Sequence, residues 1–117
     1  MAVRTALVQD IGRGLIEVTW SGLTSVDRGE IQNLSRWSDK TVEVYGTFAA
    51  NTLTLEGSMT TATSNLVALN DPNGNPLTFT AAKAEVVLEN PKYIAPRVTT
   101  GAVGANLVVK IIAKRRT

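Results

Sequence analysis

The stretch Thr41-Val42-Glu43-Val44-Tyr45-Gly46-Thr47-Phe48 decides the fold class. Its even positions hold apolar residues and a glycine, whereas its odd positions hold threonine, glutamate and tyrosine. Successive side chains of an extended chain point to opposite faces, so this alternation predicts a β-strand with one buried and one solvent-facing side. From residue 41 onward the chain repeats short apolar segments between turn residues, which predicts an all-β protein.

The same pattern, followed outward from this stretch, predicts about eight strands. They span residues 15–23, 41–48, 51–56, 66–69, 77–80, 84–89, 93–99 and 106–113. The sequence Asp71-Pro72-Asn73-Gly74-Asn75-Pro76 predicts a chain reversal, because proline fixes φ and asparagine and glycine tolerate positive φ. Residues 25–34 offer at most one helical turn. Short strands without helical crossovers favour an antiparallel β-sandwich of jelly-roll type, with an open barrel as the alternative.

Three details of strand pairing can also be predicted. The link Ala49-Ala50-Asn51 is short, so the strands on either side of it are expected to form a hairpin. Pro96 has no N–H for a ladder hydrogen bond, which places its strand at a sheet edge or at a bulge. Residues 106–113 are almost continuously apolar, which predicts a central strand covered on both faces, with Lys110 near an end.

The 117 residues are enough for one domain with one hydrophobic core. Residues 15–113 are expected to form the sandwich body, and residues 114–117 a basic tail. Residues 1–14 hold apolar side chains but little turn chemistry, so we expect either an edge strand or an irregular N-terminal arm that lies across a neighbouring subunit. No apolar run approaches the ~20 residues that cross a bilayer, and no secretory signal is evident, so no membrane partner is expected.

The chain contains no histidine and no cysteine. This excludes disulfides and thiolate zinc sites and removes the most common near-neutral base, so we expect neither an enzyme nor a cofactor. Glu85 and Glu89 share a strand face, but about 13 Å of extended chain separates them, too far for paired glycosidase carboxylates, and a solvated face is expected. Asp71-x-Asn73-x-Asn75 begins like a calcium loop but has Pro76 and Ala82 at two decisive positions, so it predicts a plain turn.

Positive charge is concentrated at the end of the chain. Lys114, Arg115 and Arg116 are consecutive, and without them nine basic residues face ten acidic ones. A near-neutral body with a short basic tail is not typical of a nucleic-acid groove, and few aromatic residues are available for base stacking. We therefore expect no direct nucleic-acid partner.

Candidate contact residues lie outside the regular strands. Trp37 follows Arg36 in a polar surround, and both residue types are enriched at binding hot spots. The alternative for Trp37 is that it caps one end of the sandwich core. Trp20 alternates in phase with the apolar residues of its strand and is expected in the core. In the first fourteen residues, Val3 and Leu7 are the expected anchors of an intermolecular contact.

Several segments resemble small structural proteins of tailed bacteriophages. The matching segments are Trp20-Ser21-Gly22-Leu23-Thr24, residues 41–48, Leu69-Asn70-Asp71-Pro72-Asn73-Gly74-Asn75-Pro76-Leu77-Thr78-Phe79-Thr80, Val87-Leu88-Glu89-Asn90 and Tyr93-Ile94-Ala95-Pro96-Arg97. The resemblance covers most of residues 15–113. It implies a capsid decoration, or cement, protein with a jelly-roll fold.

This resemblance implies a homo-oligomer, a dimer or a trimer, on the outer surface of the virion. Its partner would be the phage major capsid protein, whose adjacent subunits it would bridge. The protein itself would be made in the host cytoplasm. Similar sequences usually carry Ser-Asn-Asp-Gly and a tryptophan before the region of Leu69, whereas this chain has Ser58-Met59-Thr60-Thr61 and then Leu66. The alternative hypothesis is a carbohydrate-binding module of a phage fibre, tail or neck. Such a module would stack a sugar on an aromatic side chain, and the tryptophan expected at this place is absent.

Overall fold

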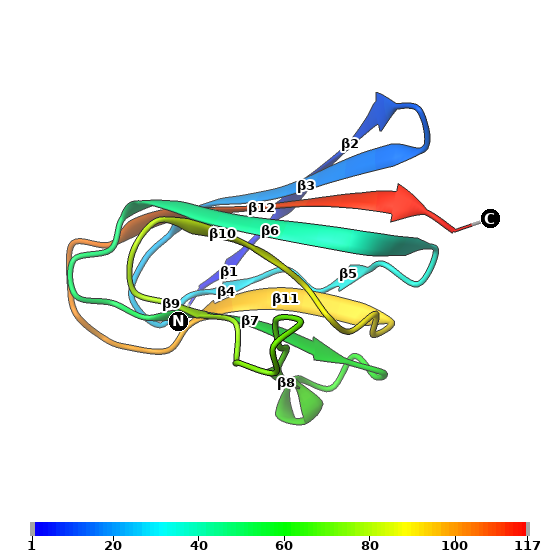
Figure 1. Cartoon of the computed structure of the whole chain (residues 1–117). Coiled ribbons are helices and arrows are strands. Elements are labelled where there is room, and N and C mark those ends of the chain that lie inside the picture. The colour runs from blue at the N-terminus through cyan, green and yellow to red at the C-terminus, as the bar shows by residue number, and fades with distance from the viewer. Residues whose placement is uncertain (1, 117) are drawn as a thin grey trace.

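Two β-sheets face each other in the computed structural model, which describes residues 2–116 (Figure 1). The five-stranded sheet has the order β10-β6-β12-β3-β2, formed by Lys83–Val86, Trp37–Thr47, Asn106–Arg115, Leu15–Leu23 and Ala6–Gly12. The seven-stranded sheet has the order β1-β4-β11-β7-β8, formed by Val3–Arg4, Arg28–Gly29, Tyr93–Val98, Leu53–Ser58 and Val67–Ala68. In the seven-stranded sheet, β5 (Gln32–Asn33) also pairs with β11, and β9 (Thr78–Phe79) with β7.

The connectivity is that of a jelly roll. From β3 onward the chain crosses from one sheet to the other between successive strands or strand groups, so that β12, the last strand, lies between β6 and β3. The predicted fold class is confirmed. The predicted helical turn in residues 25–34 is wrong, because β4 and β5 occupy this segment, and the described residues contain one short 3-10 helix, η1 (Thr63–Asn65). No described helix is long and apolar enough to span a membrane.

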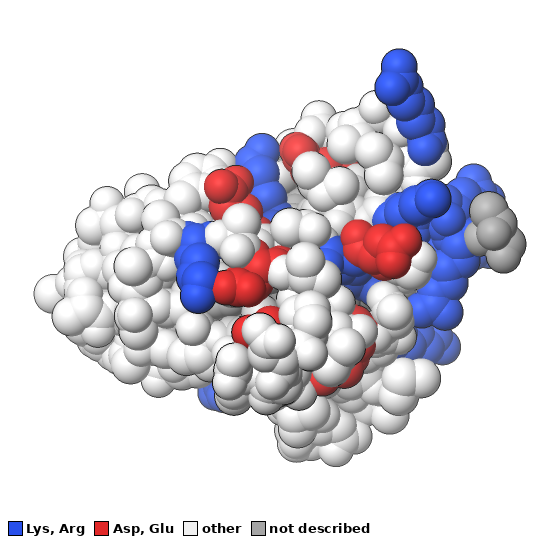
Figure 2. Space-filling view, viewed as in Figure 1, with Lys and Arg blue, Asp and Glu red and all other residues white. Residues whose placement is uncertain are grey.

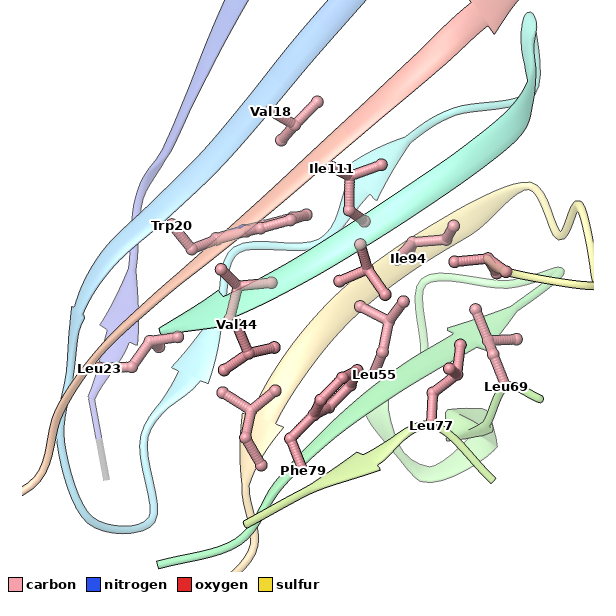
Figure 3. Packing of buried hydrophobic residues seen from close by; sticks show 14 of the residues in the cluster. Val18, Trp20, Leu23, Val44, Leu55, Leu69, Leu77, Phe79, Ile94 and Ile111 are labelled. Carbon is pink, nitrogen blue, oxygen red and sulfur yellow. The ribbon is translucent and has the colours of Figure 1, made fainter. Parts of the chain in front are cut away.

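The hydrophobic core lies between the two sheets, where side chains from both meet (Figure 3). Strand β3 has the predicted bounds and buries Ile16, Val18 and Trp20 on one face. Trp20 has no exposed surface, and its indole N–H donates a hydrogen bond to the carbonyl of Glu30 at 2.9 Å. The period-two pattern thus identified the inward face of this strand correctly.

The predicted hairpin across Ala49-Ala50-Asn51 is wrong, because β6 and β7 belong to opposite sheets. Ala49 and Ala50 both have positive φ, and they turn the chain across the edge of the sandwich. The Asn51 amide fixes this corner by donating to the carbonyls of Phe48 and Ala102 at 3.0 and 2.8 Å. The short link 49–51 therefore connects the two sheets, and β6 and β7 do not pair with each other.

Pro96 does not lie in an edge strand. Strand β11 is internal, between β7 and the short strands β4 and β5. Pro96 lies opposite Leu55 of β7, and the N–H and C=O of Leu55 are bonded to Leu77 and Leu69 on the far side of β7. The two residues therefore form no hydrogen bond with each other. The nitrogen of Pro96 points away from β7, toward the gap between β4 and β5. The missing donor falls where the ladder is already interrupted.

Strand β12 is central, as predicted, but it is not covered on both faces. Its residues alternate between buried and more exposed, and Ile112 is 41% exposed. Lys110 lies near the middle of the strand and forms an ion pair with Glu17 at 3.3 Å on the outer face. Apolar continuity indicated burial of both faces, but only one face meets the second sheet.

The solvated face predicted for Glu85 and Glu89 is only partly observed. Val87, between them, is buried in the core, and both glutamates are half-buried. Glu89 accepts hydrogen bonds from the backbone and side-chain nitrogens of Asn70 at 2.7 and 2.6 Å. Burial would raise the pKa of Glu89, but these bonds to Asn70 lower it overall, so this carboxylate holds the turn in place.

The N-terminal residues form strands of both sheets, so the edge strand is the alternative observed. β1 pairs with β4 in parallel, and β2 pairs with β3 at the edge of the five-stranded sheet. The Asp27 carboxylate fastens this segment by accepting from the backbone of Ala2 at 3.0 Å and from Arg4 Nε at 2.9 Å. Burial would raise the pKa of Asp27, but hydrogen bonds from Thr24, Arg4 and Ala2 lower it to about 2. Of the predicted tail, Lys114 and Arg115 belong to β12, and Thr117 lies outside the described residues.

We predict that Gly29→Ala destabilises the fold. A Cβ at position 29 would lie 2.6 Å from both Pro96 Cδ and Trp20 Cδ1, inside a packed layer that cannot expand. The free energy of unfolding should fall by about 1–3 kcal/mol, measured by chemical denaturation. Gly101→Ala is the matched control, because its nearest neighbour is 4.0 Å away, and it should change stability by less than about 0.5 kcal/mol. Equal effects of the two substitutions would contradict this packing.

Candidate functional site

Three segments that are far apart in the sequence meet at one end of the sandwich. Arg115 donates its backbone N–H to the carbonyl of Gly14, in the β2–β3 turn, at 2.8 Å. Arg116 donates its backbone N–H to the carbonyl of Arg36 at 2.8 Å and its Nε to the carbonyl of Trp37 at 3.4 Å. The end of β12 is thereby fixed between the β2–β3 turn and the start of β6.

This arrangement gathers positive charge, and we call it the cationic end. It comprises Arg13, Arg36, Lys114, Arg115 and Arg116, all of them exposed. Figure 2 shows Lys and Arg side chains concentrated where the C-terminus lies in Figure 1. Within residues 2–116, the ion pairs of the protein involve other cations. The rest of the chain has seven basic and ten acidic residues, so the molecule is electrically polar.

A buried lysine lies beneath the cationic end. Lys40 has no exposed surface, and its ammonium donates to Asn90 Oδ1 at 2.6 Å and to the carbonyl of Trp37 at 3.0 Å. Both acceptors are neutral. Burial, and then the positive charge of Arg116, lower the pKa of Lys40 to about 8, partly opposed by Asp39. Burial therefore accounts for most of the lowered pKa, and the nearby cation of Arg116 adds to it.

The predicted contact residues fall in two places. Arg36 and Trp37 belong to the cationic end, where Trp37 is half-buried and packs against the core, as expected of a residue that caps it. Val3 and Leu7 lie on the N-terminal strands and are 59% and 57% exposed. Their role in binding a partner remains a prediction. The sequence predicts only a basic tail for Lys114, Arg115 and Arg116, and the pairing of β12 reveals that this segment adjoins Arg36.

The edge strand β2 is the second exposed surface. All its residues except Ala6 are exposed, on both faces, and they include the apolar side chains of Leu7, Val8 and Ile11. The β2–β3 hairpin extends beyond the seven-stranded sheet, which explains why neither face of β2 is covered (Figure 1). A long edge strand with exposed apolar side chains is typical of an interaction surface.

A shallow hollow of about 580 Å³ lies between β7, β8 and the chain after β10. Its lining includes Met59, Val67, Leu69, Glu89 and Pro91. No aromatic residue is among the described residues that line it, so it offers no platform for stacking a sugar ring. Nor do residues 2–116 contain a cluster of three acidic side chains placed to hold a metal ion. The hollow therefore gives no support to the carbohydrate-binding alternative.

The chain is similar to several solved structures. The SPBc2 prophage-derived protein YomS has a TM-score of 0.62 and 12% identity, over 90% of this chain and 98% of that chain. The K1 cleaved adhesin domain of Lys-gingipain from Porphyromonas gingivalis W83 has a TM-score of 0.47 and 14% identity, over 97% of this chain and 85% of that chain, and no argument rests on it. No protein-family model and no curated protein matches the chain. The chain therefore shares its β-sandwich fold with a prophage-derived protein.

We predict that Lys40 makes stability depend on pH. The folded state releases the Lys40 proton near pH 8, whereas the unfolded state keeps it to about pH 10.5, so the free energy of unfolding should rise between these values. The rise should be roughly 1–3 kcal/mol larger in the wild type than in Lys40→Met, measured by denaturation at several pH values. Lys92→Met removes an exposed lysine and should keep the wild-type pH dependence. A parallel pH profile for Lys40→Met would contradict the burial of a cation.

Proposed function

We propose that the chain is a structural protein of a tailed-phage virion, a decoration protein that binds the outside of the assembled capsid. It bridges adjacent subunits of the major capsid protein and thereby stabilises the shell. It acts as a homo-oligomer, is made in the host cytoplasm and resides on the outer surface of the virion. It has no catalytic role.

The observation that carries the proposal is the cationic end. Five exposed cations from three segments are held together without carboxylate partners among residues 2–116, although like charges repel each other. An acidic surface on the capsid would relieve this repulsion and orient each copy as it approaches, because the rest of the chain has an excess of acidic residues. Arg36, Trp37, Arg115 and Arg116 are the proposed contact residues, with Trp37 supporting them from the core.

Two further observations support the phage assignment. The β-sandwich is shared with a prophage-derived protein over nearly the whole of both chains, although this likeness concerns the fold alone. The sequence itself resembles small phage structural proteins along residues 15–113. A protein that binds only the assembled shell stabilises it by mass action, by ~2.7 kcal/mol per site at a hundredfold excess over Kd. Simultaneous contacts to two subunits add avidity.

We predict that charge reversal at the cationic end weakens capsid binding. Arg115→Glu with Arg116→Glu should reduce the affinity for purified shells that lack the protein by more than about tenfold, since exposed cations at an interface act through long-range attraction. Binding is measured by cosedimentation of the shells with added protein at low and moderate salt. Wild-type binding should weaken as the salt concentration rises.

The matched control reverses two exposed lysines elsewhere, Lys83→Glu with Lys92→Glu, and it should bind like the wild type. Both double variants change the net charge by the same amount, so a difference between them identifies the surface. Loss of binding in both variants would attribute the effect to net charge alone. Unchanged binding of the Arg115 and Arg116 variant would overturn the proposed contact.

A further inference from the structure

Specific backbone groups of strand β2 have no partner among residues 2–116. Ala6 donates its N–H to Glu30 Oε1 at 3.2 Å, so this N–H points away from β3. Backbone direction alternates along a strand, so the N–H and C=O of Val8 and Asp10 also point away from β3. At the other end, Gly12 donates its N–H to Asp10 Oδ1 at 2.8 Å. The middle of the edge, Val8 and Asp10, is thus open, whereas the N–H groups at both ends are occupied.

Natural proteins usually protect such an edge with lysine, proline or a covering segment. The strand Ala6–Gly12 contains neither residue, is exposed on both faces and carries three large apolar side chains: Leu7, Val8 and Ile11. Another strand can satisfy its open backbone groups and cover these side chains at the same time. This combination indicates a β-strand as the missing partner.

We propose that the partner is the same strand of a second copy, paired antiparallel about a two-fold axis at Gln9. In this register Val8 lies opposite Asp10 of the partner copy, and the β-bulge of β2 between Asp10 and Gly12 falls at each end of the paired segment. The two symmetric Val8–Asp10 pairs form four backbone hydrogen bonds and use all the open groups of Val8 and Asp10. The two five-stranded sheets join into one continuous sheet.

The side chains agree with this register. It places Leu7 opposite Ile11 of the partner copy, twice by symmetry, so that apolar side chains meet on both sides of the axis. Ile11 lies at a β-bulge of β2 between Asp10 and Gly12, where it has no partner in β3. A two-fold axis at Val8 would instead place Asp10 opposite Ala6, whose N–H is already bonded to Glu30. The register at Gln9 is therefore the one that uses the groups left open.

Charge also favours the antiparallel arrangement. The cationic end adjoins the β2–β3 turn, so parallel pairing would place two cationic ends side by side. Antiparallel pairing separates them. The dimer then presents one cationic end in each direction. This association occurs between free copies in solution and does not depend on capsid binding.

Cysteine cross-linking tests the register, because the natural chain has no cysteine. Gln9→Cys places two thiols opposite each other across the proposed axis, at a spacing that permits a disulfide, so mild oxidation should convert most of the protein to a covalent dimer. A mixture of Leu7→Cys and Ile11→Cys chains should also cross-link. Val8→Cys is the matched control and should stay largely uncross-linked, since Asp10 of the partner copy lies opposite.

Sedimentation of the wild-type chain should give a dimer in the absence of any shell. Leu7→Lys replaces an exposed side chain, so the fold is kept, and it should raise the dimer dissociation constant at least about tenfold because two apolar pairs are lost. A wild-type monomer or trimer, or cross-linking of Val8→Cys in preference to Gln9→Cys, would overturn the proposal. Capsid binding by a monomeric wild type would reject this dimer and the homo-oligomeric part of the proposed function, while leaving capsid binding through the cationic end intact.

Discussion

The contact between the Trp20 indole and the backbone of Gly29 determines how the two sheets face each other. Trp20 comes from β3 of the five-stranded sheet, and Gly29 from β4 of the seven-stranded sheet, with the Pro96 ring of β11 on the same glycine. The indole N–H bonds the carbonyl of Glu30, so the large apolar side chain is buried without an unsatisfied donor. Trp20 lies in β3, which is one strand of the β2–β3 hairpin, so the position of the hairpin depends on this contact.

Local periodicity predicted the strands that are long and half-buried. The alternation around Trp20 identified both the bounds and the inward face of β3, and the turn at 71–76 separates β8 from β9 as expected. The short strands β4 and β5 have two residues each, too few to show a period, so their segment resembled a helical turn. At Ala49 and Ala50 the chain crosses from one sheet to the other through two residues with positive φ. Alanine rarely adopts this conformation, so the sequence does not predict it.

The candidate site was predictable only in part. Arg36 and Trp37 could be selected because their residue types favour contacts, and Leu7 because it is apolar outside the expected body. The cationic end depends on pairing between residues that are far apart in the sequence. Strand β12 brings Arg115 beside Gly14, and it brings Arg116 beside Arg36. No local sequence pattern predicts contacts between residues so far apart in the chain. The same holds for the open backbone groups of β2, which exist because β3 uses only one flank of the strand.

The two surfaces have complementary roles in the proposed account. The edge strand joins two copies through backbone hydrogen bonds and apolar side chains, which are largely insensitive to salt, whereas the cationic ends attach to acidic surfaces through salt-sensitive attraction. A two-fold dimer with cationic ends pointing apart has the geometry of a bridge between neighbouring subunits. Bivalent attachment allows each single contact to be weak while the assembled shell is held firmly.

The number of copies of the chain per purified virion tests the central claim most directly. It can be measured by quantitative gel electrophoresis against the major capsid protein of the same particles. A decoration protein that bridges the shell predicts a copy number that scales with the number of capsid subunits. A copy number that matches a fibre, a tail or a neck, far below that of the capsid subunits, would contradict the account.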